Sequence, residues 1–111
     1  AEALVEVNKA SEAIEIVNMV RNRAGLDPLD VDMSQEDARL AVENERQLEL
    51  LFEGHRWYDL VRNERMEEVM ATATDKNGVP MIKDVSSFRR LLPVPQSQID
   101  INERLTQNIG Y

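Results

Sequence analysis

The 111-residue sequence contains no cysteine, and this absence excludes several kinds of site. Without a thiol, the chain cannot form a disulfide, a thiolate-bound metal centre or a cysteine nucleophile. A single histidine, His55, leaves no second imidazole for a structural zinc site. Apolar residues nowhere run for the roughly 20 positions that span a bilayer. The amphipathic N-terminus carries no basic targeting segment. We therefore expect a globular chain, not a membrane segment.

Basic residues are scarce in the first half of the chain. The net charge is −8, and residues 1–59 hold 14 acidic against 6 basic side chains, whereas residues 60–111 hold 7 of each. An acidic surface repels phosphate backbones and anionic lipid, so we predict that the chain does not bind nucleic acid. The length is sufficient for one domain with one modest core.

Helical spacing of apolar residues predicts three helices, at about 3–24, 35–53 and 55–73. Gly25 and Pro28 end the first helix, a capping-box variant at Ser34 to Asp37 begins the second, and Gly54 separates the second from the third. The apolar stripe of the first helix consists of Val7, Ala10, Ile14, Val17 and Ala24. The sequence therefore predicts a mainly α fold, with residues 1–74 forming tetratricopeptide-like helix pairs. Such pairs bury their faces against neighbouring repeats, so a single domain of this size is expected to be a fragment of a longer chain.

Residues 75–111 are predicted to form a turn followed by an extended C-terminal strap. Asn77-Gly78 favours a turn with positive φ, and Pro93 and Pro95 keep their neighbours extended. One helical turn is expected after Ser97. We expect the strap to lie across the helices and to bury its apolar side chains, which are Leu91, Leu92, Val94, Ile99 and Ile101.

Candidate catalytic groups surround the stretch LFEGHRWYDLVR at residues 51–62. Glu45, Glu49 and Glu53 recur every four residues, and paired carboxylates can hydrolyse a glycoside. Such glutamates more commonly form a solvated or arginine-paired helix face. His55 could be oriented by Asp59, but no residue in this stretch is identified as a nucleophile. We therefore expect no catalysis, and keep a hydrolase acting through Glu49, Glu53 and His55 as the alternative.

The aromatic residues of this stretch favour packing over ligand binding. Trp57 and Tyr58 are successive helical positions and point about 100° apart, so they cannot form one flat sugar platform. Trp57 is predicted to be a buried anchor, and Arg56 and Asp59 are expected to make charge-assisted hydrogen bonds. The expected structural anchors are Glu45, Arg46, Phe52, Gly54, Arg56, Trp57, Asp59 and Leu60.

Three stretches resemble the SusD/RagB outer-membrane nutrient-binding lipoproteins of Bacteroidetes, in the order that the family has at its C-terminus. They are AIEIVNMVRNRAGL (13–26), ENERQLELLFEGHRWYDLVR (43–62) and LLPVPQSQIDINERLTQNIGY (91–111). Three positions depart from the family pattern. Residues 102–104 read NER where Asn-Pro-Asn is usual, Ile109 replaces a usual proline, and Gln47 stands where a second arginine is common.

The resemblance implies a surface-exposed lipoprotein of the outer membrane, whose signal and lipid anchor lie outside this sequence. Such a protein captures a glycan or another nutrient and passes it to a SusC-like, TonB-dependent transporter. It implies neither catalysis nor a cofactor. Because the family's ligand sites lie mainly in the portion not included here, no ligand-binding residue is assigned. The expected partners are the remainder of the parent protein, the transporter and the captured nutrient.

Overall fold

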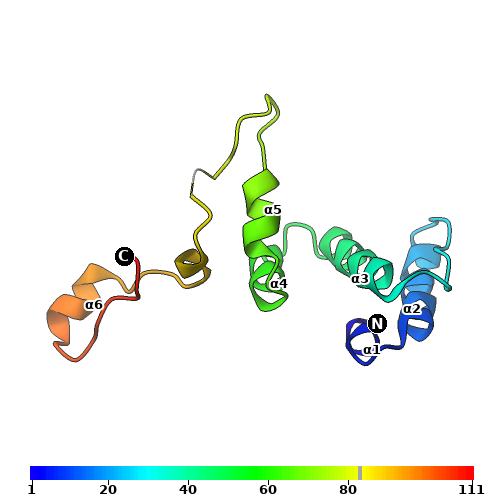
Figure 1. Cartoon of the computed structure of the whole chain (residues 1–111), viewed down its shortest axis with the longest axis horizontal. Helices are drawn as coiled ribbons and strands as arrows, with labels where there is room; N and C mark the ends of the chain where they lie inside the picture. Colours follow the sequence, from blue (N-terminus) through cyan, green and yellow to red (C-terminus); the bar gives the residue numbers. More distant parts are fainter. Residues whose placement is uncertain (83) are drawn as a thin grey trace. The chain divides into compact units, whose positions relative to one another are not determined.

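The computed structural model describes residues 1–82 and 84–111, which form two compact units at residues 1–56 and 57–111 (Figure 1). A single domain was predicted from the sequence, instead of this division. Among the described residues the regular structure is helical, apart from an isolated antiparallel bridge between Thr74 and Pro80. The prediction of a mainly α fold is confirmed.

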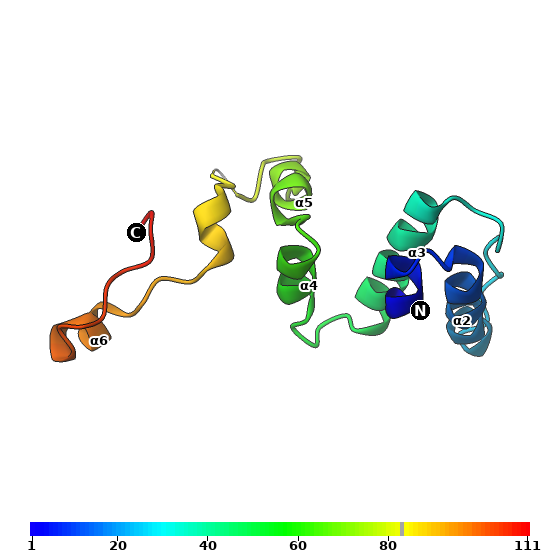
Figure 2. The same ribbon diagram turned by 60° about the horizontal axis from the view of Figure 1, so that its bottom comes forward.

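The first unit is built from three helices that lie together in both ribbon views (Figures 1 and 2). They are α1 (Glu2–Glu6), α2 (Ala10–Arg23) and α3 (Gln35–Glu49). Each helix contributes its apolar face to one shared core, because burial of apolar surface is the main favourable contribution to the free energy of folding. The buried core consists of Val5, Ala13, Ile14, Val17, Ala38 and Val42.

The single helix predicted at 3–24 is wrong, because the chain breaks between α1 and α2. Asn8 has a φ of 59°, a left-handed conformation that asparagine tolerates better than most residues. The amide of Lys9 then donates to the carbonyl of Leu4 at 2.9 Å, which closes the end of α1. Because of this break, Val5 packs in the same core as Ile14, whereas Val7 is 62% exposed.

Helix α3 begins as predicted but ends earlier than predicted. The Ser34 hydroxyl accepts from the Asp37 amide at 3.1 Å and donates to the Asp37 carboxylate at 2.6 Å. The helix ends at Glu49 and not at Glu53, because Phe52 and Gly54 adopt φ values of 68° and 79°. Phe52, which was expected to be a structural anchor, is 98% exposed.

The second unit begins with two short helices in place of the one predicted at 55–73. Helices α4 (Arg56–Arg62) and α5 (Met66–Thr72) are separated by Glu64, whose φ is 58°. The Arg65 amide donates to the Leu60 carbonyl at 2.9 Å and ends α4. This turn allows Leu60 and Met66, each 1% exposed, to be buried from successive helices.

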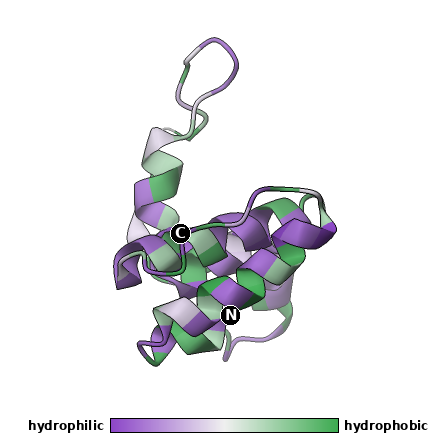
Figure 3. Cartoon of the chain, turned by 90° about the vertical axis from the view of Figure 1, so that its right-hand side faces the viewer, coloured by the Kyte–Doolittle hydropathy of each residue, from purple (hydrophilic) through white to green (hydrophobic). Residues whose placement is uncertain are grey.

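A polar turn follows α5 and projects as the hydrophilic loop at the top of Figure 3. The Asp75 carboxylate accepts hydrogen bonds from the amides of Val79 at 2.9 Å and Asn77 at 2.8 Å. These two bonds hold the pKa of Asp75 below its usual value, with the Val79 amide as the larger cause. Gly78, with a φ of 80°, supplies the positive φ that the sequence predicted for this turn.

The lowered pKa of Asp75 makes the order of this turn dependent on pH. A depressed carboxyl pKa contributes stability that is present above the unfolded value of about 4 and is lost as the pH falls through the folded pKa. We therefore expect the Val79 amide to lose protection from exchange in that acid range. NMR titration of the Asp75 carboxyl and the Val79 amide measures this. A Val79 amide equally protected in Asp75→Ala would show that the carboxylate does not hold the turn.

The C-terminal strap contains a 3-10 helix, η1 (Ser87–Arg90), and a short helix, α6 (Gln96–Ile101), where one helical turn was expected. The prediction that its apolar residues are buried is wrong for three of them. Leu91, Leu92 and Ile101 are 62%, 73% and 80% exposed, whereas Val94 and Ile99 are partly buried. Polar side chains, described below, hold this segment instead.

Candidate functional site

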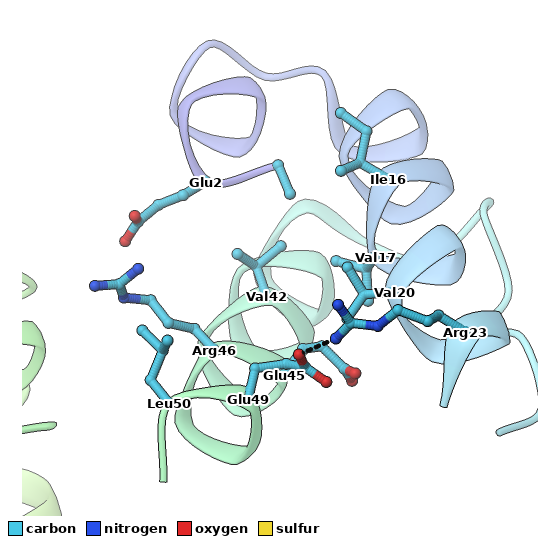
Figure 4. A pocket seen from close by; sticks show the side chains of 11 residues that line it. Glu2, Ile16, Val17, Val20, Arg23, Val42, Glu45, Arg46, Glu49 and Leu50 are labelled. Atoms are coloured by element: carbon cyan, nitrogen blue, oxygen red, sulfur yellow. Dashed lines mark hydrogen bonds and ion pairs between the residues drawn. The ribbon is translucent and has the colours of Figure 1, made fainter. Parts of the chain in front are cut away.

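The first unit contains a groove between its three helices (Figure 4). It encloses about 370 Å³ and is lined on its apolar side by Ile16, Val17, Val20, Val42 and Leu50. Valines and isoleucines from α2 and α3 meet here because their spacing places them next to the core stripe of each helix. The groove can hold an apolar group, but its lining presents no nucleophile or metal ligand set.

Charged side chains form the rim of this groove. Arg23 and Glu49 are joined by an ion pair across α2 and α3, and Arg46 and Glu2 extend toward each other at the opposite side (Figure 4). Deeper in the unit, Arg21 contacts Glu45 at 3.1 Å, and the Glu45 side chain is only 8% exposed. Two of the glutamates considered as catalytic acid and base, Glu45 and Glu49, therefore form ion pairs with arginines.

The proposed catalytic row does not form. Glu45 and Glu49 lie on α3, but the helix ends at Glu49, so Glu53 leaves that face. Nε2 of His55 lies 3.8 Å from the Glu53 carboxylate, and both side chains are about half exposed, at 49% and 58%. Within the described part of the chain, no group of three or more His, Cys, Asp or Glu side chains could hold a metal ion.

Two arginine contacts in the LFEGHRWYDLVR stretch have the charge-assisted character that the sequence analysis expected. Nη1 of Arg56 donates to Oε1 of Glu43 at 2.7 Å, and the Glu43 side chain is 6% exposed. Arg62 donates to Oδ1 of Asp59 through Nε at 3.0 Å and Nη2 at 2.9 Å. Leu60 beside them is buried. Glu43 was not predicted as an anchor, because its partner Arg56 lies beyond the end of α3, the helix that carries Glu43.

The aromatic side chains of this stretch differ in burial. Trp57 is partly buried, whereas Tyr58 is 69% exposed and Phe52 is almost fully exposed. Trp57 and Tyr58 therefore do not form a shared stacking platform. The anchoring role assigned to Trp57 stays a prediction.

A network that we call the C-terminal clasp holds the strap, and the sequence analysis missed its side chains. Gln107 accepts from the Val94 amide at 2.8 Å and donates to the Val94 carbonyl at 2.9 Å. Asn108 donates to the Leu92 carbonyl at 2.6 Å, and the Tyr111 hydroxyl donates to the Leu91 carbonyl at 2.9 Å. The one available sequence signal was the pair of prolines around Val94, which leaves a single backbone donor between them.

Gly110 closes the clasp against Phe88. The φ of Gly110 is 103°, and a Cβ at this position would lie 2.5 Å from Cγ of the Phe88 ring. Tyr111 completes the contact, edge-on to Phe88 with ring centroids 5.1 Å apart. Only glycine allows this approach of backbone to ring.

Replacing Gly110 with alanine is expected to release the clasp, at a cost of about 1 to 3 kcal/mol from overpacking and backbone strain. Hydrogen exchange at the Val94 amide measures the release. Gly78→Ala is the matched control, because its φ of 80° is equally unfavourable for alanine but nothing lies within 4 Å of the added Cβ. Equal protection of Val94 in wild type and Gly110→Ala would contradict the proposed contact.

Comparison with known proteins identifies the family. The sequence model of the SusD family matches residues 1–111. The chain belongs to the SusD family. SusD-like protein P38 of Formosa agariphila is 34% identical, and SusD-like protein P2 of the same organism is 36% identical, each across the whole of this chain. SusD-like protein P25 of that organism is 29% identical.

This SusD-family chain spans only 22% to 23% of the length of those relatives. No solved structure matches it. None of its helices in the described residues has the length and apolar character needed to cross a membrane. Family membership agrees with the resemblance on which the sequence analysis relied.

Proposed function

We propose that these residues are a helical scaffold within a surface lipoprotein of the outer membrane that captures a glycan or another nutrient. The observation that carries the proposal is the match of the SusD family across the entire chain. Members of this family are suggested to bind nutrients or glycans at the outer membrane. The whole protein would deliver its ligand to a SusC-like, TonB-dependent transporter.

The described side chains support a scaffold role over a ligand site. Two ion pairs join α2 to α3, Arg21 with Glu45 and Arg23 with Glu49. A glycan site needs polar groups free to bind hydroxyls and aromatic faces that are held in place. The most exposed aromatic side chain, Phe52, is 98% exposed in the turn that follows α3, so neighbouring side chains do not hold its ring in place.

The full-length protein tests the proposal. We expect it to co-purify from outer membranes with a TonB-dependent transporter, and to be retarded in gels that contain its polysaccharide. A panel of neutral and acidic polysaccharides would identify that ligand class. A full-length protein that neither binds any member of the panel nor co-purifies with a transporter would contradict the proposal.

The chain is expected to have no hydrolase activity of its own. Glu49 is paired with Arg23, and the half-exposed side chains of His55 and Glu53 lie beside each other without a described nucleophile. Screens with chromogenic glycosides and esters should give rates equal to those without protein. Turnover that disappears in a Glu53→Gln variant and persists in Glu36→Gln, a matched exposed glutamate, would establish the hydrolase alternative instead.

A further inference from the structure

The polar turn after α5 contains an asparagine that is followed by glycine. The sequence has eight asparagines, and Asn77 is the one with this neighbour. In the deamidation of asparagine, the backbone nitrogen of the next residue attacks the side-chain amide, and a side chain on that next residue hinders the approach. Asn77 and Gly78 are both exposed, and no described atom lies within 4 Å of a Cβ built on Gly78. Within the described part of the chain, Gly78 therefore offers an unhindered nucleophile.

The reaction at this dipeptide needs only water as a co-reactant. The backbone nitrogen of Gly78 loses its proton and attacks Cγ of Asn77, so that a bond forms between these two atoms. The bond from Cγ to Nδ2 breaks, and the side-chain amino group leaves with a proton as ammonia. Water then opens the resulting succinimide ring at either of its carbonyl carbons, which yields aspartate or isoaspartate. Oxidation states do not change in either step.

Asp75 restrains both reacting groups. The amide of Gly78 donates to the backbone carbonyl of Asp75 at 3.0 Å, so the proton that must be lost is held in a hydrogen bond. The backbone amide of Asn77 donates to Oδ1 of Asp75 at 2.8 Å, and Nδ2 of Asn77 donates to Oδ2 at 3.4 Å. The amide of Val79 donates to the same Oδ1 at 2.9 Å. A local opening that breaks these bonds frees the Gly78 nitrogen for attack.

Deamidation replaces a hydrogen-bond donor beside Asp75 with a second carboxylate. Nδ2 of Asn77 donates to the Asp75 carboxylate, whereas an ionised carboxylate in its place can only accept. Two carboxylates this close repel each other. Isoaspartate also adds a side-chain carbon to the backbone between Asp75 and Val79, which are joined by hydrogen bonds from both amides at 2.9 Å. The product therefore destabilises the turn that restrained its formation.

We propose that Asn77 is a site of spontaneous deamidation, that the Asp75 carboxylate delays this reaction, and that the modification opens the turn. Each modified molecule gains a negative charge. Hydrolysis of the succinimide does not restore the amide, so the opening is irreversible. The reaction requires neither a nutrient nor a transporter, and it holds whether or not the proposed function does.

Incubation of the full-length protein at neutral pH, followed by peptide mapping with mass spectrometry, tests whether Asn77 is modified. Digestion in mild acid keeps the reaction from continuing during the mapping. We expect Asn77 to be converted well before Asn63 and Asn102, which are also exposed but are each followed by glutamate. Asn77→Gln should abolish the modification, because the longer side chain forms a ring much more slowly.

Asp75→Ala tests the restraint. This variant should deamidate at Asn77 about tenfold faster than the wild type, because the turn then opens more often. Asp84→Ala is the matched control, since Asp84 is also exposed and its carboxylate accepts from Ser86 and Arg89. It should leave the rate at Asn77 unchanged. If Asp75→Ala does not fold, wild-type protein unfolded in urea provides the comparison and should react about tenfold faster than the native protein.

Hydrogen exchange at the Val79 amide tests the opening of the turn. The deamidated fraction, isolated by anion exchange, should lose protection at this amide, and Asn77→Asp should lose less because it carries the charge without the lengthened backbone. Three results would overturn the proposal. They are equal rates of modification at Asn77 and Asn63, equal rates at Asn77 in the presence and absence of the Asp75 carboxylate, and a Val79 amide that stays protected in the deamidated protein.

Discussion

Replacement of Ile14 by alanine is expected to lower the free energy of unfolding of the first unit by about 2 to 5 kcal/mol. Ile14 is 0% exposed and is among the largest fully buried side chains of the described residues. Alanine removes its apolar contacts and leaves a cavity between α2 and α3, since neighbouring helices relax only partly. A unit of 56 residues has roughly 3 to 8 kcal/mol of stability in total. The substitution therefore removes a large fraction of it.

Urea unfolding followed by far-ultraviolet circular dichroism measures this loss. Ile16→Ala is the matched control, because Ile16 is on the same helix and is 40% exposed. Ile16→Ala should lower the free energy of unfolding by well under half as much as Ile14→Ala. Ile14→Val should lower it by about 0.5 to 1.5 kcal/mol. Equal shifts of the unfolding midpoint for Ile14→Ala and Ile16→Ala would show that this core does not carry the unit's stability.

The core around Ile14 was partly predictable from sequence. Ile14 and Val17 were placed on the apolar stripe because a helix repeats its faces every 3.6 residues, and both are buried. Val7 was placed there by the same rule and is exposed, because the helix breaks at Asn8. Asn8 and Glu64 are non-glycine residues in the left-handed conformation, and hydrophobic periodicity gives no signal for such positions. The conformational free energy that they cost is offset only by packing elsewhere.

The clasp was less predictable, for a different physical reason. Gln107 pairs with the backbone of Val94, and amide-to-backbone bonds of this kind follow no periodicity in the sequence. The prolines beside Val94 predicted an extended segment but not what would bind it. The burial of Leu92 was predicted on the assumption that the helices of this chain would cover it. Burial depends on every atom that surrounds a residue, and the spacing of apolar residues within one segment does not report those atoms.

A second large effect is expected from Arg56→Met, which removes the guanidinium that contacts Glu43 at 2.7 Å. Taking one partner from a buried ion pair costs about 3 to 5 kcal/mol, because the remaining charge keeps its desolvation penalty. The side chains of Glu43 and Arg56 are 6% and 31% exposed, so solvent offsets part of the loss. We expect a destabilisation of about 2 to 3 kcal/mol, at or below the lower limit for fully buried pairs.

The pair of Arg39 and Glu6 supplies the matched control for this prediction. Its side chains are 43% and 60% exposed, and water screens the attraction in an exposed pair, so such a pair adds little to stability. Arg39→Met should therefore change the unfolding midpoint little, although it removes the same functional group. The double variant Glu43→Leu with Arg56→Met should recover part of the stability lost by Arg56→Met alone, since it also removes the desolvated carboxylate. If the double variant is less stable than Arg56→Met by the full cost of Glu43→Leu alone, the two side chains are not energetically coupled, and the predicted role of Arg56 as a structural anchor fails.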